Sequence, residues 1–133
     1  MSYVAEVVIP RLPKAPNVMG KASIWATQKE RVIWRRLINH AFMGIAPKAP
    51  LTCALVKCVR VSASRCDDDN LGFSFKHVLD ALTFNGIIKD DSPKTIRYVH
   101  QHEKGKRGQG KIKIFIRELE NLAQEEPNHE AVL

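Results

Sequence analysis

Cysteines are scarce in this chain of 133 residues, and long apolar runs are absent. The three cysteines, Cys53, Cys58 and Cys66, are an odd number without a CxxC spacing, which argues against a disulfide framework or a zinc site. No apolar run approaches the roughly 18 residues that a transmembrane helix needs. The first residues lack the basic and apolar regions of a signal peptide. We therefore expect a cytoplasmic protein with reduced thiols and no membrane span.

Lysine and arginine are missing from the last 16 residues, which hold five glutamates. The residues before them hold all 21 Lys and Arg against nine acids, so that part carries a net charge of +12 and the end carries −5. A basic surface of this kind attracts polyanions and binds phosphates by releasing counterions. We expect one folded domain over residues 1–119, followed by a flexible acidic tail over residues 120–133.

Acidic residues are few in the basic part, and six of the nine gather in a short stretch of sequence. These six are Asp67, Asp68, Asp69, Asp80, Asp90 and Asp91. Adjacent carboxylates raise one another's pKa unless a cation lies between them. Magnesium takes oxygen ligands and is usually held by a few carboxylates together with water and phosphate oxygens. The cluster therefore predicts a magnesium site, with manganese as the alternative ion.

The run of three aspartates allows a more detailed prediction. At the end of a strand, Asp67 and Asp69 point to one side and Asp68 to the other, which makes Asp67 and Asp69 the natural metal pair. A calcium loop does not fit, because Leu71 and Val78 stand at the fifth and twelfth positions, where oxygen ligands are needed. An acidic helix N-terminus stays open as a simpler interpretation of the run.

Hydrophobic periodicity predicts an α/β domain with a mixed sheet and two helices, in the order β-α-β-α-β-β. The predicted strands cover residues 3–9, 51–62, 95–103 and 111–118. The second of them is apolar on both faces, which is typical of a central strand. The last alternates three isoleucines with polar and aromatic residues, which is typical of a half-buried strand.

Two amphipathic stretches predict the helices. The first begins with a capping box at Thr27 and Glu30 and runs to about residue 43. Its predicted apolar stripe consists of Val32, Ile33, Leu37, Ile38 and Ala41, and its other face carries Lys29, Arg31, Arg35 and Arg36. The second covers residues 71–84, with an apolar stripe of Leu71, Phe75, Val78, Leu79 and Leu82. Asn85-Gly86 is expected to end it.

Three further features admit both a bland and a functional interpretation. Lys76 and Asp80 are either a surface ion pair at i,i+4 or place a cation near a bound phosphate. Residues 104–110 are either the tip of a hairpin or a flexible basic arm against a phosphate backbone. His100 and His102 share a strand face, but no third metal ligand lies near them in sequence.

Several of these residues together resemble the signature of RusA-type Holliday junction resolvases. The shared elements are Asp67-x-Asp69-Asn70, then Lys76, Asp80-Ala81-Leu82, Gly86 and Asp90-Asp91. The resemblance extends to about Leu119 and includes the Pro-rich loop near Asn17 and the long first helix. This chain departs from the family in one spacing, because the distance between Asn70 and Lys76 is about three residues longer here than in the family's archetype. Lys76 is therefore aligned through its distance to the Asp80 triplet.

The resemblance implies a small α/β homodimer that uses magnesium to cut branched DNA. It makes Asp67, Asp69 and Asp91 the metal-binding catalytic carboxylates and Lys76 the catalytic lysine. Asp68, Asn70 and Asp90 become accessory or structural residues. We expect contacts to the DNA backbone from the first helix and the basic loop, namely Arg35, Arg36, Lys104, Lys106, Arg107 and Lys111. A DNA-binding accessory protein of replication or recombination that keeps the fold without cutting is the alternative.

Overall fold

The computed structural model describes residues 2–13, 24–64 and 75–123 of the chain. Along these residues the elements follow as β1 (Val4–Ile9), α1 (Ile24–Ala41), β2 (Ala54–Ser62), α3 (Lys76–Phe84), β3 (Ile96–Lys104) and β4 (Lys111–Glu118). The four predicted strands are confirmed, with bounds that shift by at most three residues. The chain is a small α/β domain with a four-stranded mixed sheet and two helices, as its periodicity predicted.

The strands are ordered β1-β4-β2-β3 across the sheet. β2 pairs in parallel with β3 and antiparallel with β4, and β4 pairs antiparallel with β1. β2 therefore has a neighbour on each side, and seven of its nine residues are buried. Its apolar residues on both faces are thus explained, and the prediction of a central strand is confirmed.

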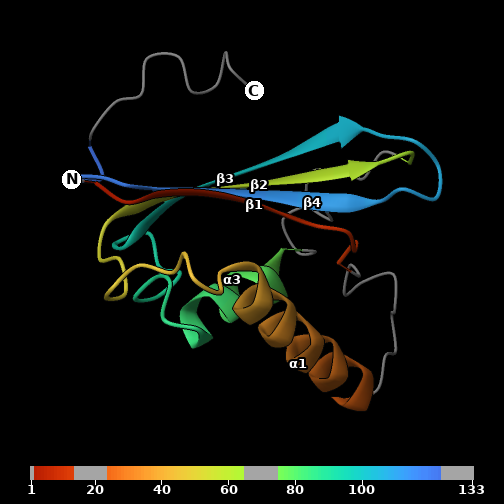
Figure 1. Ribbon diagram of the computed structural model, residues 1–133, viewed down its shortest axis with the longest axis horizontal. Coiled ribbons are helices and arrows are strands. Elements are labelled where there is room, and N and C mark those ends of the chain that lie inside the picture. The colour runs from red at the N-terminus through yellow and green to blue at the C-terminus, as the bar shows by residue number, and fades with distance from the viewer. Residues whose placement is uncertain (1, 14–23, 65–74, 124–133) are drawn as a thin grey trace.

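Both helices lie on the same face of the sheet (Figure 1). They contact each other, and their apolar faces close the core over one side of the strands. The sheet contributes alternate residues to this core, because successive side chains of a strand point to opposite faces. The largest fully buried side chains are Trp34, Phe42, Phe75, Ile38, Leu82, Ile87, Ile88, Ile112, Ile114, Ile116, Val56 and Val78.

Helix α1 differs from its predicted start and apolar stripe. It begins at Ile24, so Thr27 lies inside the helix and the predicted capping box is wrong. Val32 is 44% exposed, whereas Trp34 and Ile38 are fully buried. The Glu30 side chain is buried because it accepts a hydrogen bond from Trp34 Nε1 at 2.9 Å and another from Arg11 Nη2 at 3.0 Å. Because its carboxylate is hydrogen-bonded, the polar Glu30 can lie on the buried face of α1, where the apolar pattern had predicted only apolar residues.

Helix α3 ends where the sequence predicted. Phe84 is its last residue, and Gly86 adopts a positive φ of 71°, which glycine reaches at little cost. Asn85 joins the two helices, because its amide nitrogen donates to the Arg35 carbonyl at 3.0 Å and its amide oxygen accepts from Asn39 at 3.1 Å. The start of the predicted helix at residue 71 lies outside the described residues.

Candidate functional site

The predicted metal pair and its neighbours Asp68 and Asn70 fall in residues 65–74, outside the described part of the chain. The structure does fix where this segment leaves and rejoins the fold. It follows Ser62 and Ser64 at the end of central strand β2 and leads into Phe75, which is fully buried in the core. The aspartates therefore connect the central strand to α3.

Asp90 and Asp91 lie near the opposite end of β2. Leu51, just before that strand, bridges to Ile88, and Lys89 N donates to the Leu51 carbonyl at 2.9 Å. Strand β2 covers nine residues, so its two ends are about 26 Å apart at roughly 3.3 Å per residue. Within the described residues, no three potential ligands from His, Cys, Asp and Glu come together. Asp67 and Asp69 follow one end of β2 in the chain and Asp91 lies near the other end, so the described residues do not bring the predicted ligand set together.

Asp90 is held in a tight turn. Its Oδ1 accepts hydrogen bonds from Ser92 N at 3.0 Å and from Ser92 Oγ at 2.7 Å. The Ser92 side chain, the Thr95 side chain and the Ser92 backbone, in that order, lower the pKa of the Asp90 carboxyl to about 2. The neighbouring Asp91 is exposed. This arrangement agrees with a structural role for Asp90, which shapes the turn that presents Asp91 to solvent.

Lys76 is the exposed first residue of α3, and Asp80 lies one turn further along. The Asp80 carboxylate accepts a hydrogen bond from Arg35 Nε of α1 at 3.2 Å. The Arg35 guanidinium also lies over the Phe84 ring, 4.1 Å from its centroid. Arg35, which was predicted to contact DNA, thus helps to hold α1 and α3 together. Arg36, the next residue, is exposed.

The basic loop predicted at residues 104–110, whose first residue Lys104 ends β3, is not the tip of a hairpin. Strands β3 and β4 are separated in the sheet by β2, so the loop must cross the end of β2. Gly105 makes this crossing possible, because a Cβ there would lie 2.7 Å from Val61 Cγ1, and its N–H donates to the Ser62 carbonyl at 3.0 Å. Lys106 and Arg107 are exposed on this crossing.

This crossing brings two predicted features to one edge of the sheet. The exposed side chains of Lys104, Lys106 and Arg107 lie at the carboxyl end of β2, and the chain leaves that same end toward the aspartates. The sequence alone could not predict this proximity, because Ser62 and Gly105 are 43 positions apart in the chain. The basic loop is therefore a neighbour of the end of β2, from which the chain continues to the aspartates.

The two strand histidines serve the fold in the described structure. His102 Nε2 lies 3.0 Å from Ser62 Oγ, and that hydroxyl also donates to the Ser64 carbonyl at 2.8 Å. His102 Nε2 is therefore the donor to Ser62, since the hydroxyl has only one proton. The His100 ring packs against Tyr98 with ring centroids 5.3 Å apart. The Ser62–His102 contact has no short-range sequence signal, because it joins two different strands.

Another group of titratable side chains lies between α1 and α3 and consists of Glu30, Arg31, His77 and Asp80. His77 is buried near Glu30, and burial followed by the charge of Arg31 lowers the pKa of its imidazole, while Glu30 and Asp80 act in the opposite direction. The imidazole is consequently neutral at pH 7. A neutral imidazole costs less to bury than a charged one, which agrees with the buried position of His77 on α3.

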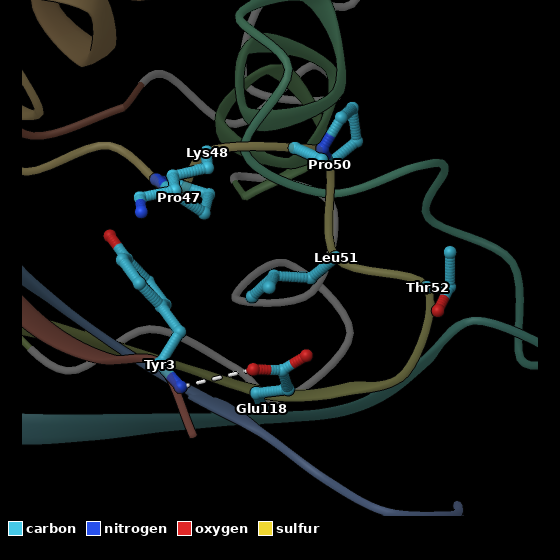
Figure 2. A pocket seen from close by; sticks show the side chains of 8 residues that line it. Tyr3, Pro47, Lys48, Pro50, Leu51, Thr52 and Glu118 are labelled. Atoms are coloured by element: carbon cyan, nitrogen blue, oxygen red, sulfur yellow. Dashed lines mark hydrogen bonds between the residues drawn. The ribbon is translucent and has the colours of Figure 1, made fainter. Parts of the chain in front are cut away.

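The described pocket has a volume of about 360 Å³ and lies at the Ala54 end of the sheet, away from the basic loop. Figure 2 shows Tyr3 and Glu118 on one side of it and residues 47–52 around the other. Tyr3 N donates to Glu118 Oε1 at 3.0 Å, and Tyr3 Oη donates to the Ile45 carbonyl at 2.8 Å. None of the residues predicted for catalysis or DNA contact lines this pocket.

The described residues include two of the three cysteines and both helices. Cys53 and Cys58 are free thiols, and burial strongly raises the pKa of the Cys58 thiol. Neither described helix is long and apolar enough to cross a membrane. Comparison with protein families finds no matching family, and comparison with curated proteins finds no relative.

Proposed function

We propose that this chain is a magnesium-dependent, structure-specific endodeoxyribonuclease that resolves four-way DNA junctions as a homodimer. The observation that carries the proposal is the shared edge at the end of β2. There, a loop with exposed Lys106 and Arg107 crosses beside Ser62, after which the chain continues to the aspartates. The ordered resemblance of residues 67–91 to RusA-type resolvases supports the same function, and the homodimer rests on that resemblance.

The donor set fits magnesium, since Asp67, Asp69 and Asp91 offer only carboxylate oxygens. When bound, the ion would supply Lewis-acid stabilisation of the charge that develops on the phosphate. Asp90 would keep the turn before Ser92 in the shape that exposes Asp91. The proposed role of Lys76, exposed at the start of α3, is to add positive charge near the phosphate.

The basic side chains of the proposed enzyme hold the DNA backbone. Lys104, Lys106 and Arg107 are exposed at the shared edge, and Arg36 is exposed on α1. Phosphate contacts of this kind fix the position of the duplex without reading its sequence. Recognition would therefore follow the shape of the branched substrate, which suits an enzyme that acts at junctions.

Cleavage of a synthetic four-way junction tests the proposal. The wild-type protein should cut the junction with magnesium and lose this activity when the metal is removed by EDTA. Asp69→Asn should reduce cleavage by at least 100-fold, on the order expected when a group essential to charge stabilisation is lost. Asp68→Asn is the matched control, with the same change at the adjacent residue, and should retain most activity. Unchanged cleavage by Asp69→Asn would contradict the proposal.

A DNA-binding module that does not cut is the second candidate. It is favoured by the exposed basic loop, whose charges do not depend on the aspartates. This candidate predicts that the wild type and Asp69→Asn bind the junction equally and that neither cuts it. The same assay therefore separates the two functions.

A further inference from the structure

The side of the sheet turned away from α1 and α3 carries no helix among the described residues (Figure 1). The strand register defines this open face as the even-numbered residues of β1 and the odd-numbered residues of β2, β3 and β4. Their neighbours along β4, Ile112, Ile114 and Ile116, point into the core on the other side. The open face is thus determined by the alternation of the strands.

Charge on the open face is predominantly positive. It holds five cations, Lys57, Arg97, Lys111, Lys113 and Arg117, against two acids, Glu6 and Glu103. The net charge of the face is therefore +3. Two copies of such a surface repel each other, whereas a polyanion is attracted to it.

The apolar side chains of the open face do not offer an alternative docking surface. Leu55, Val59 and Val61 of the central strand are buried. The large apolar residues of the open face that are exposed are Val4 and Val8, and both belong to edge strand β1. A partner at the centre of this face therefore meets its charged groups together with the half-buried side chains of Val99 and Phe115.

The cations form a path that continues from the basic loop. Lys111 begins β4 directly after that loop, and Lys113 and Arg117 follow on the same side of the same strand. Alternate residues of a strand are about 6.7 Å apart, so residues 111 to 117 span about 20 Å. A DNA arm held by Lys106 at the sheet edge can therefore continue across the open face.

The surroundings of the cations on this face also favour binding of an anion. Burial lowers the pKa of the Lys57 ammonium; Glu6 and Glu103 raise it, and Lys113 lowers it. Lys113 itself pairs with Glu103 at 3.3 Å, and both side chains are substantially exposed. Exposed pairs of this type contribute little to stability, because solvent screens the charges. A phosphate group can therefore displace Glu103 from Lys113 at small cost.

We propose that the open face binds the phosphate backbone of a duplex DNA arm. A duplex fits better than a single strand because the cations are distributed over β2, β3 and β4, which together are about 10 Å across. Single-strand sites rely on several stacking aromatics, and Phe115 is the one aromatic residue on the face. The inference rests on the proposed function only in taking DNA as the substrate.

The test compares two triple variants with equal changes of net charge. Lys57→Gln, Lys111→Gln and Lys113→Gln together neutralise the open face. Lys48→Gln, Lys89→Gln and Lys94→Gln neutralise three exposed lysines in other parts of the fold. Binding to a linear duplex and to a four-way junction is measured by fluorescence anisotropy in EDTA across a salt series, so that cleavage plays no part.

The open-face variant should bind both DNAs at least tenfold more weakly. The slope of log K against log salt should fall by about 2 to 3, since each duplex phosphate contact contributes about 0.9. The control variant should retain a slope close to that of the wild type. Glu6→Gln with Glu103→Gln, which makes the face more positive, should tighten binding, so the inference does not depend on a loss that misfolding could imitate.

Equal losses in the two triple variants, or no tightening on removal of the two acids, would overturn the inference. A change in the dimer–monomer ratio without a change in salt slope would assign the face to a second copy and overturn it as well. DNA binding by the face that is gained only after deletion of residues 124–133 would make the acidic tail its occupant, also against the inference. Failure of junction cleavage alone would count against the nuclease and leave the DNA face standing.

Discussion

The two faces of the sheet are built from the same strands yet differ in almost every physical property. On β4, Ile114 is fully buried beneath the helices, while Lys113 beside it projects to the open face. The covered face derives its stability from apolar burial. On the open face, the buried apolar side chains are mainly those of β2, and the net charge of the face is positive. One alternating strand thus serves both folding and binding, and substitutions at successive positions should separate these roles.

The largest stability effect is expected from Ile114→Ala. It should lower the free energy of unfolding by about 2–5 kcal/mol, because a buried aliphatic side chain is replaced by a cavity. Lys113→Ala is the control at the adjacent position and should change stability by less than about 1 kcal/mol, since it removes one exposed ion pair. Urea denaturation monitored by tryptophan fluorescence measures both. Similar losses at the two positions would contradict the assignment of faces.

A smaller effect is expected at the buried carboxylate of α1. Glu30→Ala should cost about 1–3 kcal/mol, because Trp34 Nε1 and Arg11 Nη2 lose their acceptor. Glu6→Ala removes the same kind of side chain from the open face and should change stability by less than about 0.5 kcal/mol. Thermal unfolding of the two variants provides the comparison. If Glu30→Ala left the melting temperature unchanged, the hydrogen bonds of Glu30 would not stabilise the covered face.

The smallest effect concerns the turn at Asp90 and depends on pH. The pKa of this carboxyl is lowered to about 2 from about 3.9 in an unfolded chain. Its hydrogen bonds therefore stabilise the fold above about pH 4, and this contribution is lost as the pH falls toward 2. Asp90→Asn should be less stable than the wild type at pH 6, with the difference shrinking in acid. A difference that stays constant from pH 6 to pH 2, measured by urea midpoints, would refute this account.

Local patterns predicted the strands well, because alternation is written into each segment. The bounds of β4 at Lys111 and Glu118 are the predicted ones. The order β1-β4-β2-β3 could not be predicted, since it depends on pairing between distant segments. For the same reason, residues 104–110 were open to interpretation as a hairpin tip, although the chain there crosses β2. Neighbours in sequence need not be neighbours in a sheet.

The candidate site was predictable only where its signal is local. Asp90 was expected to be accessory, and its bonds to Ser92, two residues later, are of the kind that Asp forms in turns. The error at Glu30 arose because its hydrogen-bond partners, the buried Trp34 and the half-buried Arg11, allow a polar residue to lie in the core, which no apolar pattern predicts. The proximity of Gly105 to Ser62 likewise required the fold.

Mapping the cut positions on a four-way junction tests the central claim most directly. Wild-type protein with magnesium should place nicks at symmetric positions in two strands of like polarity and leave a linear duplex of the same sequence essentially uncut. These nicks should disappear in EDTA and in Asp69→Asn, and they should persist in Asp68→Asn. Equal cutting of junction and linear duplex, or no cutting of either by the wild type, would contradict a structure-specific junction nuclease.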